Sequence, residues 1–138
     1  MKATIKTLIA GLLMALLLSA CGGSAEKKVS YSLKTNLQDG KMVLVGVGGN
    51  INGVVSPTLS ANVGDTVEIT FINGDGIEHD LAFPDFNAHS GHVMGQDSRT
   101  TLRFVADKSG TFTYSCTIPG HIEAGMYGTF EVTGEPAP

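Results

Sequence analysis

Alternating side chains mark the stretch Thr66-Val67-Glu68-Ile69-Thr70-Phe71-Ile72. Because successive side chains of a strand point to opposite faces, Val67, Ile69 and Phe71 would share one apolar face of a sheet. No segment after residue 20 repeats its apolar residues with the period of a helix. Further extended segments, separated by turn-forming residues, are predicted at 29–34, 42–47, 59–63, 78–83, 99–105, 111–116 and 128–132. We therefore predict an all-β Greek-key β-sandwich of about seven to eight strands.

The composition and charge of the chain limit its domains and its partners. The 138 residues include 18 Gly, no Trp and two Cys, which is typical of one turn-rich β domain rather than a disulfide scaffold. Beyond residue 20, seven basic and thirteen acidic side chains give a formal charge of −6. Since nucleic-acid binding needs clustered Lys and Arg to neutralise phosphates, we expect no nucleic-acid partner.

The N-terminus is predicted to be a lipoprotein signal peptide, residues 1–20, outside the fold. Its apolar run is short for a membrane span and ends in Leu18-Ser19-Ala20-Cys21. This ending resembles the bacterial lipobox, whose Cys thiol receives a diacylglycerol. Residues 21–28 would then be the lipidated Cys21 and a flexible tether, and residues 29–138 the folded domain. The protein would be exported and lipid-anchored to a bacterial membrane, facing the periplasm or the cell exterior. The alternative is an ordinary secretory signal with an unmodified Cys21.

The loop from Cys116 to Met126 carries the residues with metal chemistry. If Cys21 is acylated, Cys116 has no disulfide partner, and a lone thiol in an oxidising compartment is expected to be buried or used. Cys116, His121 and Met126 follow the spacing C-x4-H-x4-M, and His79 lies upstream. Two imidazoles, a thiolate and a weak axial thioether are the ligand set of an electron-transfer copper site. Each residue alone fits an ordinary core or loop position, but their combination predicts one bound copper ion.

This arrangement resembles the cupredoxin family of type 1 (blue) copper proteins over residues 40–133. The segments 46–53, 64–67, 73–80 and 110–116 also carry the resemblance, which is strongest to small cupredoxin domains related to copper nitrite reductases. The C-x4-H-x4-M spacing is similar to that of rusticyanin-like proteins. The resemblance implies that residues 29–138 form a cupredoxin domain. In it, His79 and His121 would be imidazole ligands, Cys116 the thiolate ligand and Met126 the axial ligand.

Departures from the nitrite reductase pattern argue against an enzyme. In those enzymes a further His follows the upstream ligand by five residues and helps to build the catalytic copper site, whereas this chain has Pro84 there. A catalytic copper also needs an open position for substrate, and the four expected ligands would close the site. A binuclear copper site would need two cysteines in one loop, and this loop contains Cys116 alone. We therefore expect no catalytic residues.

The expected function is one-electron transfer between larger redox proteins outside the cytoplasm. Although loops are normally polar, His121 has apolar neighbours, namely Ile118, Pro119, Ile122 and Ala124. They would form a docking surface that gives partners a short path to the copper, or else they only seal the copper from water. We expect a monomer that meets an electron donor and an acceptor in transient complexes of small area. The negative charge of the chain would steer basic partners.

Two other functions are kept as alternatives. A copper-binding lipoprotein that delivers or buffers copper for the assembly of a larger enzyme would expose His and Met, as His89, His92 and Met94 could do. That segment would be either a surface metal site or an ordinary polar loop. A non-metal adhesion module is the other alternative, and the ligand set argues against it. The colour of the purified protein separates these functions, because thiolate-bound Cu(II) absorbs strongly in visible light.

Overall fold

The computed structural model describes residues 27–135, so the predicted signal peptide, Cys21 and most of the predicted tether lie outside the described residues. The regular structure of the described chain is almost entirely β-strand, and the predicted all-β sandwich is confirmed. No helix between residues 27 and 135 has the length and apolar character needed to cross a membrane. The elements are β1 (Lys28–Gln38), β2 (Lys41–Gly46), η1 (Gly49–Ile51), β3 (Leu59–Asn62), β4 (Thr66–Ile72), β5 (Ala82–Phe83), η2 (Pro84–Phe86), β6 (Ala88–His89), β7 (Arg99–Val105), β8 (Gly110–Ser115) and β9 (Tyr127–Thr133).

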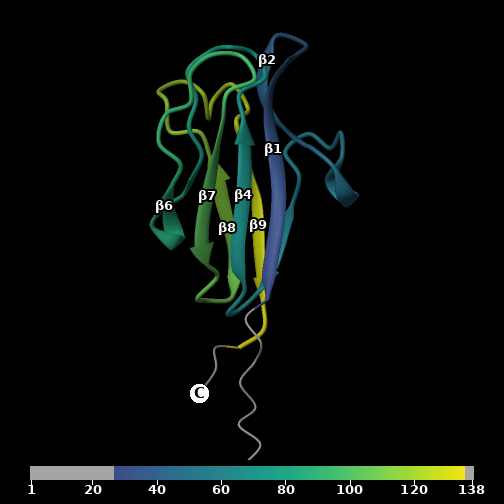
Figure 1. Ribbon diagram of the computed structural model, residues 1–138, viewed down its shortest axis with the longest axis vertical. Helices are drawn as coiled ribbons and strands as arrows, with labels where there is room; N and C mark the ends of the chain where they lie inside the picture. Colours follow the sequence, from purple (N-terminus) through teal and green to yellow (C-terminus); the bar gives the residue numbers. More distant parts are fainter. Residues whose placement is uncertain (1–26, 136–138) are drawn as a thin grey trace, which may run out of the picture.

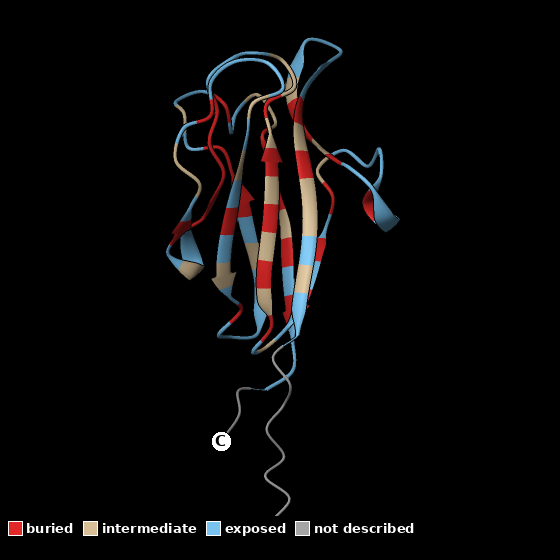
Figure 2. Ribbon diagram, in the orientation of Figure 1, coloured by how far each residue is buried: buried red, intermediate tan, exposed pale blue. Residues whose placement is uncertain are grey.

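These strands form two sheets that enclose one core (Figure 1). The first sheet has the order β2-β1-β4-β7 and the second β3-β9-β8-β5-β6. The alternation predicted in β4 is confirmed, because Val67, Ile69 and Phe71 are fully buried while their neighbours are partly exposed (Figure 2). Aromatic rings join the two sheets, with Phe104 of β7 and Phe130 of β9 lying 5.7 Å apart between ring centroids. Burying each such side chain contributes about 1.5–3 kcal/mol to folding.

The strand predicted at residues 78–83 is much shorter in the structure. Only β5 forms there, and His79 instead makes an isolated antiparallel bridge with Val93. The buried side chain of Asp80 accepts hydrogen bonds from Thr117, so this part of the chain is held across the end of the sandwich. The short strand β6, which the sequence did not predict, pairs with β5.

The strand register places the start of the domain and the expected ligands at opposite ends of the sandwich. β1 runs parallel to β4, with Lys28 opposite Thr66 and Lys34 opposite Ile72. The loop after β4 leads to His79, and the loop after β8 begins at Cys116. Both loops lie at the top of Figure 1. Since a strand rises about 3.3 Å per residue, the chain enters the domain about 20 Å from the ligand end.

Candidate metal centre

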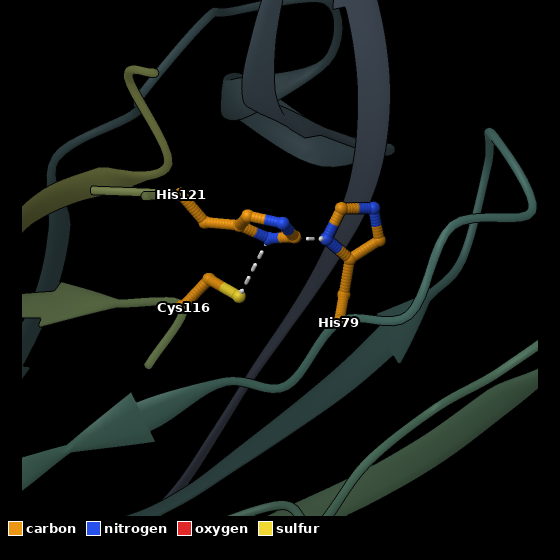
Figure 3. A group of neighbouring side chains, drawn as sticks. All are labelled: His79, Cys116 and His121. Carbon is orange, nitrogen blue, oxygen red and sulfur yellow. Dashed lines mark hydrogen bonds between the residues drawn. The ribbon is translucent and has the colours of Figure 1, made fainter. Parts of the chain in front are cut away.

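Three of the four expected ligands converge at this end of the sandwich. Donor atoms of His79, Cys116 and His121 all lie within 4.8 Å of one another, the one such group found in residues 27–135. The Nδ1 atoms of His79 and His121 are 3.2 Å apart, and Cys116 Sγ lies 3.4 Å from His121 Nδ1 (Figure 3). Protein metal ions such as zinc form bonds of about 2.0 Å to imidazole and 2.3 Å to thiolate, so one ion can touch both atoms of each pair. The cluster is therefore able to bind one copper ion.

Met126 closes the loop that carries Cys116 and His121. The Met126 N–H donates to the His121 carbonyl, and the Met126 carbonyl accepts from the Cys116 N–H, both at 3.0 Å. Its side chain is fully buried. The preceding Gly125 has φ +112, and a Cβ there would lie 3.2 Å from the Met42 carbonyl oxygen of β2, so glycine lets the loop pack closely. The structure places Met126 beside two expected ligands, and the axial role of its sulfur stays a prediction.

The upstream ligand is oriented by a carboxylate that the sequence analysis did not single out. His79 Nε2 donates to both carboxylate oxygens of Asp75, at 2.8 and 3.0 Å. Both side chains are almost completely buried, with 0% and 4% of their surface exposed. In the ring form that carries one proton, on Nε2, Nδ1 has a free lone pair on the side of the cluster. A carboxylate on the second nitrogen of a ligand His also fixes the ring and raises its basicity.

A fully buried asparagine shapes the loop that holds Asp75. Asn73 Oδ1 accepts from the N–H groups of Asp75 and Gly76, at 3.3 and 2.8 Å. Its Nδ2 donates to the carbonyls of Ile77 and Val93, at 2.5 and 3.0 Å. Val93 is also the bridge partner of His79. One side chain thus ties the loop to the segment that positions His79.

A second carboxylate links the two ligand loops. Asp80 follows His79 and is fully buried, and both of its oxygens accept from Thr117, which follows Cys116. His89 Nε2 donates to the same carboxylate at 2.6 Å. Burial raises the pKa of Asp80, but the hydrogen bonds from Thr117 and His89 outweigh it and hold the pKa below its ordinary value. The ionised carboxylate fixes the distance between the loops before any metal binds.

Burial also sets the protonation of the metal-free ligands. It raises the pKa of the Cys116 thiol from its ordinary 9.0 to about 11, so the thiol is protonated at neutral pH. Burial and the nearby His79 lower the pKa of His121, so this imidazole is neutral and able to bind a metal. A bound cation would stabilise the thiolate, and binding must therefore release the Cys116 proton.

The predicted docking residues surround the ligand that is nearest to solvent. His79, Cys116 and Met126 have no exposed surface, whereas 8% of His121 is exposed. Ile122 is 46% exposed and Pro119 is also exposed, while Ile118 and Ala124 are half-buried. Ile118 packs against the core, which fits a sealing role, and Ile122 projects into solvent, which fits a docking role.

The sequence patterns gave no role to Asp75 or Asp80, although both lie in the segment 73–80 that carries the family resemblance. One local signal was present, since an Asp four residues before a candidate ligand can reach its ring when a turn intervenes. The contact between Asp80 and Thr117 joins residues 37 apart in sequence, and no local pattern predicts it.

A solved structure has a similar fold. Rusticyanin from Thiobacillus ferrooxidans superposes with a TM-score of 0.58 and 26% identity, over 79% of each chain. The chain has a cupredoxin-like fold. In this cupredoxin-like fold the His-Cys-His cluster lies at one end of the sandwich, between the loops that follow β4 and β8. The multicopper oxidase Fet3p has a similar fold, with a TM-score of 0.59 and 21% identity over 81% of this chain and 24% of that one.

Sequence relatives are also copper proteins by name. A family model described as multicopper oxidase matches residues 86–136, which include Cys116, His121 and Met126. The copper-containing nitrite reductase of Pseudomonas chlororaphis is 30% identical over 118 residues, or 72% of this chain and 32% of that enzyme. The copper-resistant cuproprotein CopI of Rubrivivax gelatinosus is 33% identical over 91 residues, or 51% of this chain and 54% of that protein. The chain spans about a third of the length of the nitrite reductase.

Proposed function

We propose that this cupredoxin is a one-electron carrier with a mononuclear type 1 copper site, tethered to a membrane surface outside the cytoplasm. One observation carries the proposal: the buried Cys116 sulfur and the imidazoles of His79 and His121 lie within 4.8 Å of one another, on two loops that are braced against each other. A site whose ligands are held in place before the metal binds changes little between Cu(II) and Cu(I). Little reorganisation then opposes electron transfer.

The burial of the cluster supports a carrier rather than an enzyme. A substrate must reach an open metal position, but His79, Cys116 and Met126 are fully buried and His121 is 8% exposed. An electron can instead pass through the edge of an imidazole without contact between partner and metal. Pro84, at the position where the nitrite reductase pattern has its further His, begins the helix η2 and offers no metal ligand.

The position at which the chain enters the domain supports the proposed tether. The chain enters β1 at Lys28, at the end of the sandwich opposite His79 and His121. If a diacylglycerol on Cys21 holds the protein on a membrane, the copper end can point away from the lipid surface toward soluble partners. A transient partner would dock on Ile118, Pro119, Ile122 and Ala124 and exchange its electron through His121.

Delivery or buffering of copper is the second candidate function. The similarity to CopI favours it, as do the exposed side chains of His89, His92 and Met94. A delivery protein must release its metal readily, whereas a carrier keeps it through many redox cycles. The rate at which a strong chelator removes copper from the oxidised and the reduced protein separates the two. Rapid removal of copper by the chelator from either oxidation state would favour delivery.

The proposal is tested by the visible spectrum of the copper-loaded full chain. Thiolate-to-Cu(II) charge transfer should give an intense band, and Cys116→Ser should abolish it because a hydroxyl cannot replace the thiolate. Ser115→Ala is the matched control, since this neighbouring side chain is buried but is not an expected ligand. A Cys116→Ser protein that folds and keeps the band would overturn the assignment.

A further inference from the structure

Two histidines outside the cluster lie close together on the surface. His89 ends β6, and His92 follows after a turn in which Gly91 adopts φ +72. Their ring centroids are 6.4 Å apart and the ring planes are nearly perpendicular, at 86°. The side chains are 47% and 53% exposed, so both rings are open to solvent. The centre described above uses neither ring as a ligand.

Each of the two rings has one nitrogen held by a carboxylate. His89 Nε2 lies 2.6 Å from Asp80 Oδ2, and His92 Nδ1 lies 2.7 Å from Glu78 Oε1. Because an ionised carboxylate only accepts hydrogen bonds, it selects the ring form that carries the proton on this nitrogen. The remaining nitrogens, His89 Nδ1 and His92 Nε2, then carry free lone pairs. Carboxylate-held imidazoles of this kind are the usual form of histidine metal ligands.

The spacing of the rings suits one shared ion. An ion about 2.0 Å from an imidazole nitrogen lies roughly 3 Å from the ring centre, so two rings about 6 Å apart can share one ion when their free nitrogens face it from opposite sides. The carboxylates of Glu78 and Asp80 add negative charge behind the two rings. Imidazole suits copper, zinc and nickel, and the order of affinities for divalent first-row metals favours Cu(II).

We propose that His89 and His92 form a second, solvent-exposed site that binds one divalent transition-metal ion, Cu(II) most tightly. Two protein ligands leave the other positions of the ion to water. Binding there is therefore weaker and faster to exchange than in the buried cluster. The site has no thiolate ligand, so its Cu(II) lacks the intense visible band and gives the electron paramagnetic resonance signal of ordinary nitrogen-ligated copper. The proposal does not depend on the function of the buried centre.

The test is a metal titration of the full chain after its buried site has been loaded with one equivalent of copper. Equilibrium dialysis against Cu(II), and separately against Zn(II), should show one further equivalent. His89→Gln and His92→Gln should each weaken this binding at least tenfold, and the double variant should abolish it. His92 is exposed and contacts the exposed Glu78, so His92→Gln should keep the thermal unfolding temperature of the wild type. His89 also donates to the buried Asp80 carboxylate, so the visible band of the buried site is recorded for His89→Gln to show that the ligand loops are intact. Met94→Leu, which removes a nearby exposed sulfur, is the matched control and should bind as the wild type does.

Several outcomes would overturn the shared site. The shared site is excluded if the wild type binds no further equivalent of metal. It is also excluded if the wild type and the double variant bind the metal equally, which would indicate an adventitious ion only. Weakening by one substitution but not the other would show that the two rings do not share an ion. The same titration with Cys116→Ser keeps the two sites distinguishable. That variant should still bind one Cu(II) that is lost on substitution of His89 and His92, in addition to any copper that His79 and His121 retain.

Discussion

Replacing Asp75 by Asn should raise the reduction potential of the bound copper. The Asp75 carboxylate accepts from His79 Nε2 at 2.8 and 3.0 Å and is almost completely shielded from water. Asn has nearly the same shape and can still accept from Nε2 through its amide oxygen, so the ring should stay in place. The substitution removes one negative charge that stabilises Cu(II) more than Cu(I). Its loss therefore favours the reduced state.

The size of this effect follows from the arrangement of the groups. A carboxylate on one ring nitrogen and an ion on the other are about 7 Å apart, and two unit charges at that distance interact by about 2.4 kcal/mol at an effective dielectric constant of 20. For a one-electron couple, 59 mV corresponds to about 1.4 kcal/mol. The expected rise is therefore on the order of 100 mV.

A redox titration followed at the visible band measures this shift. Asp97→Asn is the matched control, because Asp97 also lies at the ligand end, where its N–H donates to the Asn73 carbonyl, but its side chain is 69% exposed. Water and salt screen an exposed charge, so the control should shift the potential by less than about 20 mV. A fall in potential, or a rise no larger than that of Asp97→Asn, would refute the reasoning if the variant keeps its band and its unfolding temperature.

Three further predictions concern the other parts of the site. Met126→Leu should keep copper bound but raise the reduction potential, because a weak donor is replaced by an apolar group. A lower potential in the same redox titration would count against Met126 sulfur as the axial ligand. Ile122→Glu should leave the visible spectrum unchanged and slow electron exchange with a physiological partner about tenfold, which is about 1.4 kcal/mol. Val105→Glu is the control, because Val105 is 47% exposed against 46% for Ile122 but pairs with Thr66 at the opposite end of the sandwich. Equal electron-exchange rates for the two variants would exclude docking at Ile122. Loading the metal-free protein at pH 7 should release about one proton from Cys116, and none from Cys116→Ser, because burial holds the thiol pKa at about 11. Since this pKa is raised above its ordinary 9.0, protonation of the thiol stabilises the metal-free fold at neutral pH, and this stabilisation should be lost as the pH rises from 9 to 11. Denaturant unfolding of the wild type, but not of Cys116→Ser, should show that loss.

Sequence patterns predicted the regular strands better than the irregular segments between them. β4 and β7 have the predicted bounds, 66–72 and 99–105, because a half-buried strand needs alternating side chains along its whole length. The segment 78–83 has polar and apolar residues in a similar order, but only β5 forms there. Its polar groups at His79 and Asp80 are buried. They are satisfied by Asp75, four residues before His79, and by Thr117 from the other ligand loop. In an alternating pattern, polar residues indicate the solvent-exposed face of a strand. The pattern cannot show that these polar side chains are instead buried and hydrogen-bonded.

The sequence by itself determined the class of the fold and the kinds of donor atoms available for a metal. Both follow from local information, since alternation specifies strands and the spacing of Cys116, His121 and Met126 specifies one loop. The tertiary structure decided which groups surround those donors: Asp75 behind His79, Asp80 between the ligand loops, and a nearly buried His121 facing solvent. It also decided that the ligand end lies opposite the entry of the chain, through the parallel register of β1 and β4. Apart from Asp75, which lies four residues from His79, these features depend on side chains and strands that are distant in sequence and meet only when the two sheets pack, so no local pattern encodes them.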